Sequence, residues 1–201
     1  MNKPFSVACE RNRDPILVVL QEALRDCRHV LEIGSGTGQH AVYFGAALPH
    51  LVWQTSDLPE NHEGILAWLH EAGLPNVLPP LLLDASGQGW PRQGFDAVYT
   101  ANTCHIMSWD EVEAMFAGVG RLLPEGGLFC LYGPFNYNGR FTSESNAQFD
   151  AMLRAQVPHR GIRDIEKIVA LASAQGMHLE LEDDHAMPAN NRLLVFRKGD
   201  S

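Results

Sequence analysis

Short apolar runs alternate with amphipathic stretches along the chain from Val30 onward. Apolar runs of about five residues indicate buried strands, and apolar residues that recur every three or four positions indicate helices that cover them. The pattern predicts strands over 29–33, 51–56, 77–83, 95–101 and 128–132, and helices over 39–47, 60–72 and 108–123. Such an alternation is typical of an α/β protein with a mostly parallel sheet.

The two ends of the chain add a first helix and a closing pair of strands. Asp14 is placed to cap an N-terminal helix that has Pro15 at its first position. A loop over 133–146, rich in Gly, Asn and Ser, precedes the last predicted elements, which are helices over 148–155 and 164–175 and strands over 177–182 and 193–197. The last two strands are too close in sequence for the helical crossover of about a dozen residues that parallel strands need, so we expect an antiparallel hairpin.

Composition narrows the class of protein. The chain has 201 residues, of which 45% are hydrophobic and 19% charged, so we expect one domain over residues 1–201. Its formal net charge of −9 has the wrong sign for wrapping nucleic acid or docking on anionic lipid, and neither partner is expected. The longest apolar run, Ile16 to Leu20, is far shorter than the roughly 18 residues that span a bilayer, and we expect a cytoplasmic protein.

Cysteine and histidine spacing gives no metal-site pattern. The four cysteines form no C-x-x-C pair, so we expect reduced and mostly buried thiols, with neither a disulfide nor a zinc site. The histidines likewise show no metal-ligand spacing. No metal is expected, and the oligomeric state stays open.

A glycine-rich loop follows the first predicted strand. It reads E-x-G-x-G-x-G from Glu32 to Gly38, whereas a dinucleotide fingerprint would place its third glycine where Gln39 stands. This spacing is the S-adenosylmethionine form of the loop, in which glycines let a ligand approach the backbone. The alternative is a strand-to-helix turn that holds no ligand.

Acidic residues end the first three predicted strands and sharpen the choice of ligand. Asp57 is placed to accept hydrogen bonds from two ribose hydroxyls, Asp84 from an adenine amine, and Glu32 from a methionine ammonium. Three carboxylates suit a cationic, donor-rich ligand and would repel a pyrophosphate. For Asp84 the alternative is a loop acid that caps a turn.

These features agree with a family resemblance over almost the full length. The chain resembles the methyltransferase-like protein 26 family in segments 8–17, 34–40, 132–134, 138–139, 145–146, 149–150, 152–154, 161–164 and 187–191. The resemblance implies a Rossmann-like class I methyltransferase fold, with a mostly parallel seven-stranded sheet that ends in an antiparallel hairpin. It also implies S-adenosylmethionine binding on Glu32, Gly34, Gly36, Gly38 and Asp57, but it implies no particular reaction.

The predicted cofactor site combines the glycine loop with the residues after the next three strands. Its members are Glu32, Gly34, Ser35, Gly36, Gly38, Asp57, Leu58, Asp84, Ala85 and Asn102. S-adenosylmethionine would be converted to S-adenosylhomocysteine there. Methyl transfer mainly requires alignment of the reactants and exclusion of water.

Chemistry beyond the cofactor is expected from the later loops. His105 is the candidate general base, because its ordinary pKa lies near neutral pH, and the alternative is a buried, hydrogen-bonded histidine that shapes the turn. The predicted acceptor pocket consists of Asn12, Tyr132, Asn136, Tyr137, Asn190 and Asn191. The tyrosines can alternatively be core residues and the asparagines turn formers. Arg11 and Arg13 are either solvated charges or a site for a carboxylate-bearing substrate.

Three functions remain in competition. The leading hypothesis is an S-adenosylmethionine-dependent methyltransferase that acts on a small molecule. The second is a non-catalytic S-adenosylmethionine-binding module that senses the cofactor or pairs with a protein partner. A nicotinamide-dependent oxidoreductase is disfavoured by Gln39 and by the closing hairpin.

Overall fold

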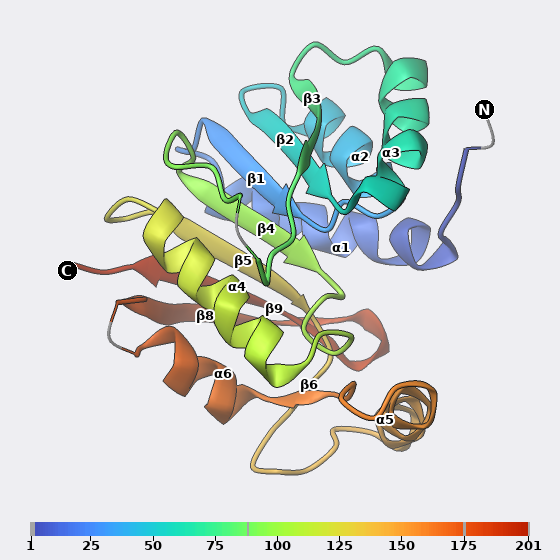
Figure 1. Cartoon of the computed structure of the whole chain (residues 1–201), viewed down its shortest axis with the longest axis vertical. Helices are drawn as coiled ribbons and strands as arrows, with labels where there is room; N and C mark the ends of the chain where they lie inside the picture. The colour runs from blue at the N-terminus through green and yellow to red at the C-terminus, as the bar shows by residue number, and fades with distance from the viewer. Residues whose placement is uncertain (1–2, 88, 175, 201) are drawn as a thin grey trace.

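A seven-stranded sheet runs through the computed structural model, which describes residues 3–87, 89–174 and 176–200. Its strands follow the order β3 (Val77–Leu82), β2 (Val52–Asp57), β1 (His29–Ile33), β4 (Ala97–Ala101), β5 (Leu128–Gly133), β9 (Asn191–Lys198) and β8 (Leu179–Met187) (Figure 1). The first five strands are parallel, and β9 is antiparallel to both of its neighbours. The predicted parallel sheet with a closing antiparallel hairpin is confirmed.

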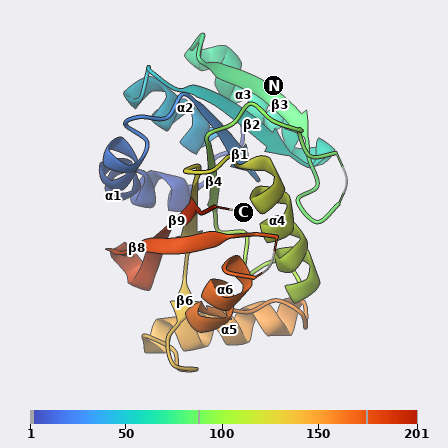
Figure 2. The same ribbon diagram turned by 90° about the vertical axis from the view of Figure 1, so that its left-hand side faces the viewer.

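Helices cover both faces of this sheet (Figure 2). One face carries α1 (Val7–Ala23), α2 (Gln39–Ala47) and α3 (Pro59–Ala72), and the other carries α4 (Trp109–Leu122) and α6 (Ile165–Ala172), while α5 (Glu144–Gln156) lies beyond α6. Side chains alternate between two cores, because successive strand residues point to opposite faces. Leu31 belongs to the α4 side, whereas Val30 belongs to the α1 and α2 side.

The strand order reverses direction between β1 and β4. The chain builds outward from β1 through β2 to β3, then returns to place β4 on the other side of β1. Ligands of open α/β sheets bind in the crevice at the carboxyl ends of the strands at such a switch point. In this chain Gly34 and Asn102 directly follow the two strands at that position.

The first helix begins earlier than predicted. Ser6 is the residue that caps α1, and its Oγ accepts a hydrogen bond from the backbone N–H of Cys9, so the prediction of a start at Asp14 was wrong. Pro15 lies inside α1 and cannot donate the usual helical hydrogen bond to the carbonyl of Arg11. On the N-terminal side of this proline, the cap residue Ser6 and Asn12 of α1 make polar contacts with α2.

The third strand is at the edge of the sheet and is less buried than predicted. Of the residues in β3, only Val77 is buried, and Leu81 and Leu82 are exposed. An edge position explains how the strand tolerates Pro79 and Pro80, since one side of an edge strand needs no hydrogen-bond donors.

The C-terminal part departs most from the predicted boundaries. Ser143 caps α5 through its Oγ, so this helix begins at Glu144 instead of Gln148. The hairpin strands are longer than predicted and are joined by a 3₁₀ turn over Pro188–Asn190. Two short strands, β6 (Phe135–Asn136) and β7 (Arg163–Asp164), form a second sheet that the sequence pattern did not predict. Position 175, the predicted end of α6, lies outside the described residues.

Candidate functional site

Two cavities adjoin at the carboxyl end of the parallel strands. The first, which we call the glycine-loop cavity, has a volume of about 420 Å³ and lies between the glycine loop and the residues after β2, β3 and β4. The second, which we call the α1 cavity, has a volume of about 650 Å³ and lies beneath the start of α1. Asn102 lines both, so the two cavities meet at the residue that follows β4.

Most of the predicted cofactor residues line the glycine-loop cavity. They are Gly34, Gly36, Asp57, Leu58, Asp84, Ala85 and Asn102. Glu32, Ser35 and Gly38 are not part of its wall, and each of them shapes the loop from below instead. Sequence reasoning missed several other residues of the wall, among them Asn61 of α3, Glu111 of α4, and Thr103, Ile106 and Met107 of the loop between β4 and α4.

Gly36 brings the bare backbone of the loop to the cavity. Its φ of 59° lies in the left-handed region, and a Cβ at this position would meet no heavy atom closer than 4.0 Å. Its backbone N–H donates a hydrogen bond to Oδ2 of Asp57 at 2.7 Å. The loop therefore presents an open surface that is fixed in place by the acid at the end of β2.

Asp57 has limited capacity left for a ligand. A carboxylate offers about four acceptor positions. Besides the bond from Gly36, its Oδ1 accepts the backbone N–H of Leu58 at 2.7 Å and the side-chain amide of Asn61 at 2.9 Å. One position on Oδ2 remains, so binding of two ribose hydroxyls by Asp57 would require Asn61 or Gly36 to give way.

Glu32 faces away from the cavity. Its Oε2 accepts hydrogen bonds from Oγ of Ser35 at 2.8 Å and from Nε1 of Trp53 at 3.0 Å. Burial raises the pKa of Glu32 to about 7, although the two hydrogen bonds act in the opposite direction. The residue braces the glycine loop against β2 on the α1 side of the sheet.

Gly38 lets α3 approach the loop closely. A Cβ on Gly38 would lie 3.1 Å from Cα of Ile65 and 3.3 Å from Cβ of Trp68, and the backbone φ is 91°. Both the close contact and the left-handed conformation favour glycine. This glycine therefore serves packing and does not contact the cavity.

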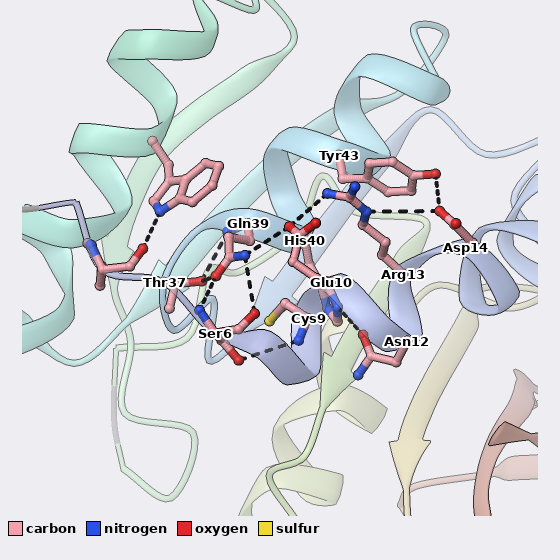
Figure 3. Close-up of polar contacts among 12 residues, drawn as sticks. Ser6, Cys9, Glu10, Asn12, Arg13, Asp14, Thr37, Gln39, His40 and Tyr43 are labelled. Carbon is pink, nitrogen blue, oxygen red and sulfur yellow. Dashed lines mark hydrogen bonds and ion pairs between the residues drawn. The ribbon is translucent and has the colours of Figure 1, made fainter. Parts of the chain in front are cut away.

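The start of α1 is tied to the start of α2 by buried polar contacts (Figure 3). Oε1 of Gln39 accepts the backbone N–H of Ser6 at 2.6 Å, and its Nε2 donates to Oε1 of Glu10 at 3.1 Å. Nε2 of His40 lies 2.7 Å from Oδ1 of Asn12. Because α2 also carries the end of the glycine loop, these bonds fix the wall of the α1 cavity relative to that loop.

His40 is neutral in this network. Burial lowers its pKa to about 4. Its Nδ1 lies 3.2 Å from the hydroxyl of Tyr99. A neutral imidazole has one donor and one acceptor nitrogen, so Nε2–H donates to Oδ1 of Asn12 and Nδ1 accepts the hydroxyl hydrogen of Tyr99. His40 thus holds Asn12 in a fixed orientation at the α1 cavity.

The α1 cavity has an apolar and amide-rich wall. His105, Asn102 and Tyr132 come from the loops and strands at the centre of the sheet, and Phe149 comes from α5. Burial raises the pKa of Tyr132, while the side chains of Asn12 and Asn191 act on its hydroxyl in the opposite direction. All of these groups are uncharged at neutral pH.

His105 is buried and has a low pKa. Burial, together with the nearby guanidinium groups of Arg163 and Arg160, lowers its pKa to about 4. Arg163 in turn holds the loop around His105, since it donates hydrogen bonds to the carbonyls of Cys104 and Met107. The ring of His105 packs edge-on against Phe149 at a centroid distance of 5.4 Å.

The predicted acceptor-pocket residues divide into two groups. Asn12, Tyr132 and Asn191 line the α1 cavity, whereas Asn136, Tyr137 and Asn190 do not. The Asn136 amide is buried against the carbonyl of Ile162. Tyr137 donates its hydroxyl to Oδ2 of Asp184, in the edge strand β8, at 2.7 Å.

Asn190 is the third residue of that second group. It sits in the hairpin turn with a φ of 58°, so the turn-forming role is confirmed for it. Sequence reasoning missed Phe149 and Asn146, because nothing in the chain pattern indicates that α5 returns to the cavity.

No group of three or more His, Cys, Asp or Glu side chains in the described ranges is arranged to hold a metal ion. None of the helices in those ranges is long and apolar enough to cross a membrane. The four cysteines are thiols; Cys27, Cys104 and Cys130 are buried, as predicted, and Cys9 is half-buried.

The fold is similar to that of several solved methyltransferase structures. An O-methyltransferase family protein from Burkholderia thailandensis gives a TM-score of 0.79 at 17% identity, over 93% of this chain and 56% of that one. An O-methyltransferase family 2 protein from Planctomyces limnophilus, in complex with apigenin, gives 0.80 at 18% identity over 93% and 56%. PigF with S-adenosylhomocysteine gives 0.77 at 16% identity over 92% and 55%.

At these identities the similarity shows the fold, which is the Rossmann-like class I methyltransferase fold that was predicted. The chain spans a little over half the length of each of these proteins. The narrower resemblance to the methyltransferase-like protein 26 family stays a prediction. A sequence-family model matches residues 3–198, and the chain therefore belongs to the family described as "Protein of unknown function (DUF938)".

Proposed function

We propose that this protein transfers a methyl group from S-adenosylmethionine to a small-molecule acceptor. The observation that carries the proposal is the pair of adjoining cavities, one beside the glycine loop and one beneath α1, which meet at Asn102. A donor in the first cavity and an acceptor in the second would have their reacting groups on either side of this residue. Such juxtaposition is the main requirement of the reaction.

The residues of the glycine-loop cavity fit the cofactor. Asp57, Asp84 and Glu111 give its wall a negative charge, and none of the described residues that line it is a Lys or Arg. A cationic sulfonium with many hydrogen-bond donors suits that wall, whereas a pyrophosphate would be repelled. The open backbone at Gly36 allows close approach of the ligand.

Individual residues would hold different parts of the cofactor. Asp57 and Asn61 would bind the ribose, Asp84 the adenine amine, and the backbone beside Gly34 the methionine portion. When bound, S-adenosylmethionine would supply an electrophilic methyl group. The acceptor atom would bond to this methyl while the bond between methyl and sulfur breaks, and the electron pair of that bond would stay on sulfur, which gives S-adenosylhomocysteine.

The chain's own residues would align the acceptor and exclude water. Uncharged groups face the meeting point of the cavities, as expected where a positive charge disappears in the transition state. Asn102 is held there with a φ of 59° and donates its backbone N–H to the carbonyl of Tyr132 at 2.9 Å. Phe149 and the start of α1 would close the acceptor side against solvent.

His105 is the proposed acceptor of the proton that an oxygen or nitrogen nucleophile must lose. With a pKa of about 4 it is neutral at physiological pH and can accept a hydrogen bond. It is too weak a base to ionise an ordinary alcohol, so it suits acceptors that are themselves acidic. The same low pKa is the observation that favours the second candidate function, a non-catalytic module that only binds the cofactor.

Calorimetric titration with S-adenosylhomocysteine tests cofactor binding. We expect Asp57→Ala to weaken binding at least about tenfold, because it removes a ligand-facing acceptor and releases Gly36. Asp26→Ala is the matched control, since this acid is 93% exposed, lies 3.9 Å from Arg25 and does not line the cavity. Unaltered affinity in the Asp57 variant would remove this cavity from consideration.

A second experiment separates catalysis from binding alone. The protein is incubated with methyl-labelled S-adenosylmethionine and a metabolite extract, and labelled products are collected. We expect a labelled small molecule whose formation falls in Asn102→Ala and His105→Gln. Tight cofactor binding with no transferred label would favour the binding module over the enzyme.

A further inference from the structure

The two cavities carry opposite charge. The acidic groups Asp57, Asp84 and Glu111 line the glycine-loop cavity, with no Lys or Arg among its described lining residues. The α1 cavity has the opposite kind of charge. Among the described residues that line it, Arg11 is the one Lys or Arg, and none is an Asp or Glu. The two walls therefore differ in the sign of their charge, although the chain as a whole has a net charge of −9.

Arg11 has an available guanidinium group, unlike the arginine two positions later. Nη1 of Arg13 pairs with Oε1 of Glu10 at 2.8 Å, and its guanidinium lies over the ring of Tyr43 at 4.5 Å (Figure 3). Arg11 is exposed and forms no ion pair or side-chain hydrogen bond with any described residue. It follows that Arg11 can bind an anion without first losing an internal partner.

The position of Arg11 at the rim is fixed by its neighbours. The adjacent Asn12 is bonded to His40, and Ser6 at the start of the helix is bonded to Gln39. These contacts hold the first turns of α1 over the cavity, so the side chain of Arg11 starts from a rigid element. Because the backbone beneath Arg11 is already held, an anion that binds there has to order only the side chain and not the helix.

Two further arginines add positive potential behind the cavity. The guanidinium groups of Arg160 and Arg163 lie close enough to His105, a residue of the cavity wall, to lower its pKa, although burial is the larger cause. Arg163 is bonded to backbone carbonyls. The buried Nε of Arg160 has no hydrogen-bond partner among the described residues. Neither guanidinium lines the α1 cavity, so among the described residues Arg11 is the cation that a ligand in this cavity would contact.

The remaining wall suits a flat apolar body. Phe149, Pro134 and Pro188 supply apolar surface, and Val7 and Ala8 complete it from the helix. A volume of about 650 Å³ is within the usual range for a small-molecule site. A ligand with a ring-sized apolar part and one anionic group would match both the surface and the charge.

We propose that the methyl acceptor is a small organic acid with a ring-sized apolar body, whose carboxylate is bound by Arg11 at the rim of the α1 cavity. The carboxylate serves as the anchor, and the apolar body lies against Phe149, with the nucleophilic atom directed toward Asn102. This inference rests on the proposed methyl transfer, because it names the substrate class of the same site. The charge pattern complements a cationic donor in the neighbouring cavity.

Binding of paired probes tests the proposal. Benzoate, phenylacetate and 4-hydroxybenzoate are titrated against the protein by NMR, with and without saturating S-adenosylhomocysteine, and each is compared with its primary amide. We expect at least one acid to bind about tenfold more tightly than its amide, because only the carboxylate pairs with Arg11. Arg11→Gln should bring the two affinities to within about twofold.

Arg25→Gln is the matched control, because it removes the same charge from an exposed site just after the other end of α1. It should leave the preference for the acid unchanged. Arg11→Lys should retain part of the preference, since it keeps the charge but loses the planar fork. Equal binding of acids and amides, absence of binding by all three acids, or an acid preference that survives in Arg11→Gln would each overturn the proposal.

The cofactor titration keeps the two proposals distinguishable. If S-adenosylhomocysteine binds and the acids fail, the substrate class is wrong while methyl transfer stands. If the acids bind through Arg11 but S-adenosylhomocysteine does not bind, the α1 cavity is an acid site and the proposed methyl transfer is wrong.

Discussion

Replacing Glu32 with Gln should change how stability depends on pH. Glu32 is only 3% exposed, and burial raises the pKa of its carboxyl from 4.5 to about 7. Both neighbouring donors, Ser35 and Trp53, bond to Oε2, which leaves Oε1 to carry the proton. A Gln side chain has the shape and hydrogen-bonding pattern of this protonated form, so Glu32→Gln should fold normally.

The size and sign of the effect follow from proton linkage. Between pH 4.5 and about 7 the folded protein holds a proton on Glu32 that the unfolded chain has released, so stability falls as the pH rises. A shift from 4.5 to about 7 corresponds to about 3 kcal/mol at 1.36 kcal/mol per pH unit. This stability is fully present below the lower pKa and is lost above the higher one.

Urea unfolding at about pH 5 and about pH 8.5 measures this contribution. The wild type should lose about 2 to 3 kcal/mol of unfolding free energy from the lower to the higher pH that Glu32→Gln does not lose. The variant should therefore be more stable relative to the wild type at about pH 8.5 than at about pH 5, by that amount. Glu22→Gln, at a residue that is 77% exposed, provides the control for net charge and should show no such trend. A difference between wild type and Glu32→Gln that stays constant within about 0.5 kcal/mol would refute the reasoning.

Two further substitutions probe the framework of the site, and equilibrium unfolding measures both. Gly38→Ala should destabilise the protein by about 2 kcal/mol or more, because the new Cβ would crowd Ile65 at a φ of 91°; Gly139→Ala, where φ is 67° and no atom lies within 4 Å, should cost only about 1 kcal/mol. Equal losses at the two glycines would contradict the packing role. Asn12→Ala should cost about 1 to 3 kcal/mol, since it leaves a buried nitrogen of His40 without its partner. A loss below about 0.5 kcal/mol would show that this hydrogen bond does not hold the helix in place.

Local signals in the sequence predicted the elements around the glycine loop. The strand over His29–Ile33 and the helix over Gln39–Ala47 have the predicted bounds, because a short apolar run and a glycine-rich turn specify both without help from distant residues. The capping box at Ser108 was also confirmed, with Glu111 completing it. The seven strands and their closing hairpin followed from the order of these elements.

The place of each strand in the sheet, and the face of the sheet to which each strand residue points, were harder to infer. Nothing in the sequence of 77–82 marks the strand as an edge, so its exposure depends on which neighbour it pairs with. Glu32 has the right residue type at the end of β1, yet it points to the α1 side because Leu31 and Ile33 occupy the α4 side. Alternation along the strand contained this signal, which a motif-based interpretation overlooked.

The sequence by itself determined the class of fold, the order of strands and helices, and the position of Gly34, Gly36, Asp57 and Asp84 at the carboxyl ends of the first three parallel strands. Those properties depend on residues that are close together in the chain. Tertiary structure alone decided that Arg11, Asn102 and Phe149 share one cavity, since they come from three elements far apart in sequence. Such proximity arises from packing of whole helices on the sheet, which no short stretch of sequence encodes.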